Sequence, residues 1–227
     1  MPAPTSTLLL RALPLIRTHG FTRETLSLAG AVPTSSGPNT TSKPAGEPLS
    51  DRAVSALFGE GDEARKTLIR AWLAEGLSAM NDTTSVVEGQ VSQPMTVRDA
   101  LRRRLEYNTP VLHQLPEIYA LLASPRFATP LLDPMPALKH VSRVADTACR
   151  VGGDESLHLA WYSKRGSLAA IYGAAELHQL ASPATAKAFL DSLLDGSRKM
   201  GTAVDETLGY SHYIVKSWQG ILKSYSY

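Results

Sequence analysis

Five consecutive residues, Trp161-Tyr162-Ser163-Lys164-Arg165, combine the side-chain types that carry most of the binding energy in protein interfaces. Trp, Tyr and Arg bury large areas and still offer a polar or charged group to a partner. Large aromatic residues at the start of a helix are usually core residues, which is the competing interpretation. The residue types indicate partner contact by Trp161, Tyr162, Lys164 and Arg165, with burial in the core as the alternative.

The segment 157–177 around these residues is predicted to be one helix, because it lacks Pro and is rich in Ala and Leu. At about 100° per residue, one stripe of this helix is bulky and consists of Trp161, Arg165, Leu168 and Tyr172. A different face carries only small residues, namely Gly166, Ala169, Ala170 and Gly173. A bare face lets either a neighbouring helix or a narrow apolar ligand approach the backbone, and the pattern does not distinguish the two.

Patterns for catalysis and metal binding are weak. Glu155-x-x-His158 is the one spacing that resembles a metal motif, whereas a di-iron bundle needs two such motifs and two further carboxylates. The sequence contains no Gly-rich phosphate loop and no serine nucleophile elbow. The single cysteine, Cys149, cannot form an internal disulfide or a cysteine zinc site, and we expect it in the core. We therefore expect no enzyme activity, no metal and no cofactor.

The composition is that of an ordinary globular protein. The 227 residues are 43% hydrophobic, and 23 basic residues against 21 acidic ones give a formal net charge of +2. This balance does not indicate a nucleic-acid-binding surface. No apolar run approaches the length of about 18 residues that a membrane-spanning helix needs, so any membrane contact is expected to be peripheral.

Almost every periodic segment has the helical period, and no alternating strand pattern occurs. Capping signals predict helix starts at Thr22, Ser50 or Asp51, Thr96 with Asp99, Asp154 or Ser156, and Ser182-Pro183. A Pro- and Ser-rich segment at 31–50 is expected to be a flexible insertion. We expect an all-α protein of roughly nine or ten helices. Its parts are predicted at residues 1–80, 81–200 and 201–227.

The first 29 residues contain three Arg and one acidic residue, Glu24, together with several Ser and Thr. This composition is typical of a mitochondrial presequence. The same segment has apolar residues at helical spacing and a His19-Gly20 stop, as expected of a domain helix. The residues therefore fit both a presequence and the first helix of the domain.

The segment WYSKRGSLAAIYGAAEL resembles the signature helix of a known family, the ubiquinone-biosynthesis accessory proteins known as the ninth Coq protein, in a fungal-like form. Three other stretches agree in order and spacing: LPLIRTHGFTRETLSLAG, ALRRRLEYNTPVLHQLPEIYALL and RKMGTAV. The resemblance implies a fold like that of the TetR repressors and a peripheral location on the matrix side of the mitochondrial inner membrane. It also implies isoprenoid lipid as ligand and the di-iron demethoxyubiquinone hydroxylase, with other ubiquinone-biosynthesis proteins, as partners.

With this resemblance, the aromatic and basic helix start is expected to face the partner, and the small-residue region to leave a channel for an isoprenoid tail. The residues expected to line the lipid site are Gly166, Leu168, Ala169, Ala170, Ile171, Tyr172 and Gly173. The expected function is a non-catalytic carrier that presents a quinone intermediate to the hydroxylase. Whether the chain forms a homodimer is left open.

A TetR-like fold raises a rival function, ligand-responsive DNA binding. A helix-turn-helix needs a tight turn, but about twenty residues separate the candidate helices 21–28 and 51–58. The second of these helices carries Arg52 as its only base, with acidic residues close behind it. DNA binding is therefore disfavoured.

The C-terminal segment has the clearest amphipathic pattern. Its apolar arc comprises Leu208, Tyr210, Ile214, Val215, Trp218, Ile221, Leu222 and Tyr225. Lysines lie opposite, and aromatic residues on an apolar face with lysines on the polar face are typical of a helix in a membrane interface. The alternative is a terminal helix docked on the core or on a second subunit.

We predict that deletion of residues 208–227, or Trp218→Asp combined with Ile214→Asp, abolishes flotation with cardiolipin-containing vesicles. The reason is that the apolar arc enters the acyl boundary and its lysines face anionic lipid. Circular dichroism should still report a cooperative helical domain. A truncated protein that floats as well as the full chain contradicts the membrane role, and one that cannot fold supports the docked helix.

Overall fold

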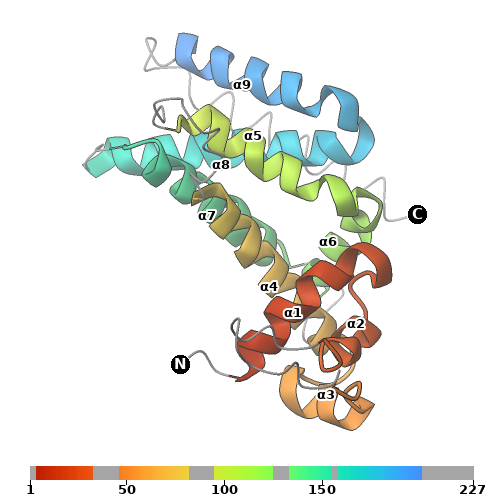
Figure 1. Ribbon diagram of the computed structural model, residues 1–227. Coiled ribbons are helices and arrows are strands. Elements are labelled where there is room, and N and C mark those ends of the chain that lie inside the picture. Colours follow the sequence, from red (N-terminus) through yellow and green to blue (C-terminus); the bar gives the residue numbers. More distant parts are fainter. Residues whose placement is uncertain (1–3, 33–45, 82–94, 125–132, 155–157, 201–227) are drawn as a thin grey trace, which may run out of the picture. The chain divides into compact units, whose positions relative to one another are not determined.

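The computed structural model describes residues 4–32, 46–81, 95–124, 133–154 and 158–200. Within these ranges the chain forms nine α-helices, two short 3-10 helices and no strand (Figure 1). The α-helices are α1 (Pro4–His19), α2 (Arg23–Leu28), α3 (Asp51–Phe58), α4 (Asp62–Asn81), α5 (Val97–Asn108), α6 (Leu115–Ala123), α7 (Met135–Val151), α8 (His158–Ala181) and α9 (Ala186–Met200). The all-α prediction is confirmed, and the TetR-like arrangement stays a prediction.

Local capping chemistry sets several helix starts as the sequence predicts. The Thr22 hydroxyl accepts a hydrogen bond from the Thr25 backbone at 3.3 Å, and Ser50 does the same for Ala53 at the start of α3. Thr96 caps α5 by accepting from the Asp99 backbone at 3.2 Å, and its hydroxyl donates to the Asp99 carboxylate. These side chains satisfy backbone donors that have no partner inside the helix.

Prolines shape two further boundaries. Pro116 predicts a kink or a break inside the segment 110–122, and this is confirmed, because the segment is divided between a 3-10 helix, η1 (Thr109–Gln114), and α6, in which Pro116 occupies the first turn. The predicted cap at Ser182 is wrong, because Ser182 makes no side-chain cap and a 3-10 turn, η2 (Pro183–Thr185), precedes α9. At the start of α8, the carboxylate of Asp154 binds Lys164 and Arg165, and the alternative cap, Ser156, lies outside the described residues.

The chain divides into two compact units. The first comprises residues 1–76 and 108–136, and it therefore combines the N-terminal helices with η1 and α6. The second comprises residues 77–107 and, after residue 137, α7, α8 and α9. The predicted division into residues 1–80, 81–200 and 201–227 stays a prediction.

In the first unit, α1 buries Ala12 and Ile16 completely or almost completely, as expected of a domain helix. Helices α2 and α3 contact each other although the insertion separates them along the chain. The two ends of the insertion meet: the Leu49 backbone donates to the Ser27 carbonyl at 2.9 Å, and the Ser27 hydroxyl donates to the Leu49 carbonyl at 2.5 Å. The insertion therefore leaves the pairing of α2 with α3 in place.

In the second unit, α8 and α9 form an antiparallel pair joined by η2 (Figure 1). Buried residues of α5, α7, α8 and α9 and the end of α4 share one apolar core, which contains Leu101, Leu105, Val144, Tyr172 and Leu190 among others. On the edge of this core, Arg98 and Arg102 of α5 bind Asp191 of α9 at 3.0 and 2.5 Å. The hydrogen bond from Arg102 holds the pKa of Asp191 below its ordinary value. The core and these ion pairs together hold α9 against α5.

No helix in the described part of the chain is long and apolar enough to cross a membrane.

Candidate functional site

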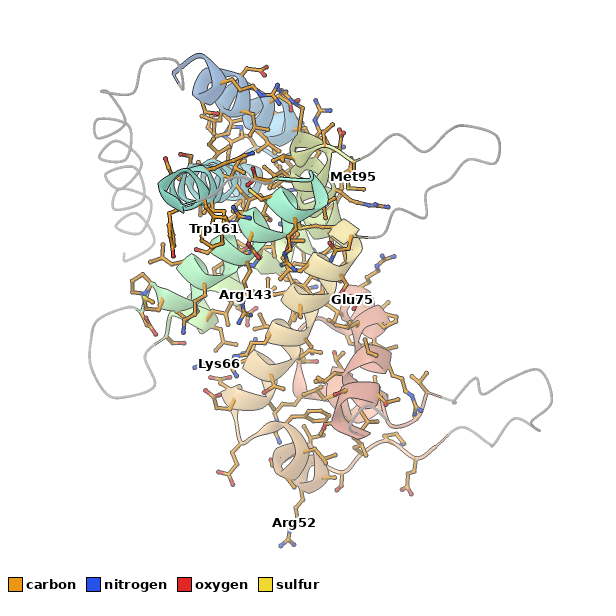
Figure 2. All side chains as sticks on the ribbon, turned by 90° about the vertical axis from the view of Figure 1, so that its left-hand side faces the viewer. Arg52, Lys66, Glu75, Met95, Arg143 and Trp161 are labelled. Atoms are coloured by element: carbon orange, nitrogen blue, oxygen red, sulfur yellow. The ribbon has the colours of Figure 1, made fainter. Side chains whose placement is uncertain are left out.

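Trp161, which is labelled in Figure 2, and its neighbour Tyr162 are exposed at the start of α8. Trp161 is 37% exposed and Tyr162 is 70% exposed, so the alternative that places this pair in the core does not hold. Their ring centroids are 4.7 Å apart at an interplanar angle of 76°, an edge-to-face contact that aromatic quadrupoles favour. Two large aromatic side chains are thus held together in solvent at one end of the helix.

Arg165 lies one turn later and supports this pair. Its guanidinium carbon is 4.1 Å from the centre of the Trp161 ring, a cation–π distance. The side chain itself is held by two carboxylates, with its Nε donating to Asp146 at 3.0 Å and a terminal nitrogen donating to Asp154 at 3.1 Å. Partial burial lowers the pKa of Arg165, but these hydrogen bonds and charges outweigh that effect and keep the pKa above its ordinary value. Trp161, Tyr162 and Arg165 together are called the aromatic platform below.

Asp154 is the inner anchor of this arrangement. Its side chain is only 4% exposed, and it binds Lys164 at 2.5 Å as well as Arg165. A buried carboxylate without cations would be strongly destabilising, so two cations on successive residues of α8 satisfy it. Asp146, at the surface of α7, binds Arg150 at 2.8 Å in addition to Arg165.

The turn after α7 explains how Asp154 reaches this position. The Gly153 backbone donates to Arg150 and the Asp154 backbone donates to Cys149, which is the Schellman pattern of helix termination. Gly153 has φ of +66°, a left-handed conformation that favours glycine. Gly152 packs so closely on Val97 that an added Cβ would lie 2.6 Å from a methyl carbon of that residue. Gly152 and Gly153 therefore permit the close packing and the left-handed turn with which the chain leaves α7.

The residues predicted to line the lipid site do not form one exposed face. Gly166 is exposed with open space around it, Ala170 is half-buried, and Gly173 is buried. The others, Leu168, Ala169, Ile171 and Tyr172, belong to the apolar core of the second unit. The predicted division into a bulky and a bare face is therefore replaced by a division along the length of α8: residues 161–167 are mostly exposed, and most of residues 168–176 are buried. The lipid role of these residues stays a prediction.

Sequence reasoning missed a buried polar cluster deeper in the same unit. The Tyr172 hydroxyl donates to Glu176 Oε1 at 2.7 Å, and a ring nitrogen of His140 lies 3.3 Å from the same oxygen. Burial raises the pKa of Glu176, but His140, the charge of Arg104 and the Tyr172 hydrogen bond outweigh it, so the pKa lies below its ordinary value. Arg104 is completely buried. The cluster joins α5, α7 and α8 through one carboxylate.

No pattern in the sequence identifies this cluster, because its members come from three separated helices. The described residues contain no group of His, Cys, Asp and Glu side chains that could hold a metal ion. Cys149 is buried, as expected, and burial raises the pKa of its thiol. The predicted membrane-binding residues of the C-terminal segment lie outside the described residues, as do Glu155 and the side chain of His158.

Comparison with known proteins gives consistent matches. The COQ9 family model matches residues 135–201, which contain α7, the aromatic platform, α8 and α9. A protein of Drosophila melanogaster, "Ubiquinone biosynthesis protein COQ9, mitochondrial", is 31% identical over 150 residues, which are 64% of this chain and 44% of the relative. The protein of the same name from Bos taurus is 25% identical over 221 residues, 94% of this chain and 63% of the relative. The chain thus spans about half of the length of these curated relatives.

We predict that Glu176→Gln lowers the free energy of unfolding at neutral pH by about 3 kcal/mol or more, since it leaves two buried cationic or polar partners without their carboxylate. A folded-state pKa below the ordinary value of 4.5 means that the ionised carboxylate stabilises the protein above about pH 5. The stabilisation by the ionised carboxylate is lost progressively as the pH falls from about 4.5 towards the lower pKa of the folded state. Urea unfolding between neutral and acidic pH should show the difference between wild type and variant shrinking in acid.

The matched control is Glu106→Gln, which removes an exposed carboxylate paired with Lys187 and should cost about 1 kcal/mol or less. Equal losses for the two variants, or a difference that does not depend on pH, would contradict the role of the buried cluster.

Proposed function

We propose that the chain, which is similar to COQ9 proteins in these matches, is a non-catalytic accessory protein of ubiquinone biosynthesis. It binds an isoprenoid quinone intermediate and presents that lipid to the di-iron demethoxyubiquinone hydroxylase. Its place is the matrix side of the mitochondrial inner membrane, as a peripheral protein. The names of both relatives contain ubiquinone biosynthesis and the mitochondrion.

The observation that carries the proposal is the aromatic platform. An exposed Trp–Tyr pair is costly to leave in water unless a partner covers it, and Trp, Tyr and Arg are the residues that dominate interface hot spots. The carboxylates of Asp146 and Asp154 fix Arg165 and so limit the freedom of the Trp161 ring. A side chain that is already ordered loses less entropy when the partner binds.

The lipid half of the proposal rests on the middle of α8. Ten consecutive residues, 166–175, carry no charged side chain and are mostly small, between Arg165 and Glu176. Each buried CH₂ group of a polyprenyl tail contributes about 0.8 kcal/mol, so such a tail is seldom free in water and needs an apolar host during transfer. Small side chains on neighbouring helices give a chain-like ligand the space to enter.

The DNA-binding alternative finds little support in α3. Its exposed surface carries Asp51 beside Arg52, and the exposed Glu60 and Asp62 follow it. The other nearby cation, Arg23, donates to Asp51 at 2.6 Å and to Ser55 at 2.7 Å. Phosphate contacts need cations that are free to displace counterions, and carboxylates beside them repel the backbone of DNA. Weak retention on DNA that does not depend on salt would agree with the absence of phosphate contacts.

We predict that Trp161→Lys weakens binding of the hydroxylase by about 2 kcal/mol or more while the fold is retained, because the variant removes a hot-spot side chain from the surface. The measurement is the equilibrium dissociation constant of the purified pair, with thermal melting of the variant alone. Leu57→Lys, on the exposed side of α3, is the matched control and should bind normally. Normal binding by a folded Trp161→Lys protein would refute the platform as the partner site.

We also predict that Gly173→Leu reduces the isoprenoid lipid that co-purifies with the chain, because the added side chain fills the space of the tail. Mass spectrometry of extracted lipid measures the effect. Gly196→Leu is the control, since a Cβ at this position of α9 meets nothing within 4 Å. If Gly173 serves only helix packing, the variant instead overpacks the core by roughly 1–3 kcal/mol and lowers the melting temperature at normal lipid content.

A further inference from the structure

Helix α7 presents a row of cations to solvent. At about 100° per residue, Lys139, Arg143, Asp146 and Arg150 lie on one side of the helix, within about 60° of arc. The three cations are exposed, and Figure 2 labels Arg143 on α7 and Trp161 on α8. Lys139, Arg143 and Arg150 are called the basic stripe, and they extend over about 16 Å along the axis of α7.

The charge of the basic stripe is not balanced within the described part of the chain. Asp146, the one carboxylate on this side of α7, is already bound by Arg165 and Arg150. No carboxylate of the described residues forms an ion pair with Lys139 or Arg143. On the α5–α9 side of the same unit, by contrast, Arg98 and Arg102 share Asp191. Lys139 and Arg143 are therefore exposed cations that are available to meet an external negative charge.

The basic stripe is continuous with the aromatic platform. Asp146 belongs to the stripe side of α7 and also holds Arg165, the support of Trp161. Lys164, with a side chain that is 46% exposed and bound to Asp154, adds a further cation at the start of α8. A partner that covers Trp161 and Tyr162 therefore meets the cations at the end of the stripe.

The arrangement fits a protein surface better than a bilayer. A helix that lies in a membrane interface places its apolar face in the acyl region, with cations along the edges. The apolar face of α7 is already used, because Val141, Val144, Ala145 and Ala148 are packed in the core. Met135 and Leu138 are exposed at the start of α7, but the outward side of the helix from Lys139 to Arg150 carries only polar and charged side chains. The exposed residues of α8 next to the platform, Ser163, Gly166 and Ser167, have nothing to insert either.

We propose that the basic stripe docks an acidic surface of the same partner that the aromatic platform binds. This inference rests on the proposed function. It extends that function by stating the charge of the partner surface and by assigning different kinetic roles to the basic stripe and the aromatic platform. Charges at the rim of an interface mainly accelerate encounter and set orientation, whereas a central aromatic anchor sets the lifetime of the complex. The stripe therefore controls association, and the platform controls dissociation.

The test measures association and dissociation rates between the full chain and the purified hydroxylase at about 0.05 M and 0.5 M salt. Lys139→Glu with Arg143→Glu should slow association about tenfold at low salt and leave dissociation within about twofold. High salt should remove most of the difference between this variant and the wild type. Arg143→Glu alone should give an intermediate rate. Arg52→Glu, which makes the same charge change on α3, should associate as the wild type does.

Each other outcome identifies which idea fails. Association of the stripe variants at the rate of Arg52→Glu, together with loss of binding by Trp161→Lys, overturns the stripe and leaves the proposed function in place. Failure of the wild type to bind the hydroxylase overturns both. Stripe variants that bind the hydroxylase normally but no longer float with vesicles of phosphatidylcholine and cardiolipin overturn the proposal in favour of a lipid surface. Melting curves and circular dichroism of each variant confirm that the fold is retained.

Discussion

The guanidinium of Arg165 connects the exposed start of α8 with the structure beneath it. It lies over Trp161 on one side and is bound by Asp146 of α7 and by Asp154 of the turn on the other. A cation over an exposed aromatic ring contributes only about 0.5–1 kcal/mol, so the stacking alone would not order the Trp161 side chain. The carboxylates do this, because each fixes one edge of a planar group that has five donors in a rigid geometry. The platform therefore depends on where α7 ends as much as on α8 itself.

A second fixed point lies eleven residues further along α8, at Glu176. Buried there, one carboxylate receives Tyr172 from its own helix and His140 from α7, close to the charge of Arg104 from α5. Buried polar groups that must all find partners restrict how neighbouring helices can slide, because a shift would leave a charge unsatisfied. Helix α8 is thus held at Arg165 and Glu176, and the uncharged part between them packs in the apolar core through Leu168, Ile171 and Tyr172. This part is where we propose that the isoprenoid tail lies.

The first unit shows how a long insertion can leave a helix pair intact. Because Ser27 and Leu49 exchange hydrogen bonds, the ends of the segment between α2 and α3 are close together. A loop that begins and ends at nearly the same place adds little constraint to the rest, and lengthening it costs little entropy. The pair α2–α3 keeps its contact, while the exposed residues around it are mostly acidic or already paired.

The sequence by itself determined the elements and the chemistry at their ends. Helical period, proline positions and capping residues such as Thr22, Ser50 and Thr96 predicted the all-α class and most helix limits, because these signals act over one turn of backbone. The residue types also singled out Trp161, Tyr162 and Arg165. Local patterns could not determine which faces of α8 are buried. Leu168, Ile171 and Tyr172 enter the core because α5, α7 and α9 pack around that part of the helix, whereas the first turns lack such neighbours.

Only the tertiary structure decided the partners of the charged residues. Asp154 has the spacing of a helix cap, and only the turn at Gly153 directs its carboxylate to Lys164 and Arg165. His140, Arg104 and Glu176 are separated by at least 36 residues and have no common pattern, yet they meet in the core. The physical reason is that electrostatic pairing depends on distance in space, and two helices that approach within a few ångströms bring together charges that the chain keeps far apart.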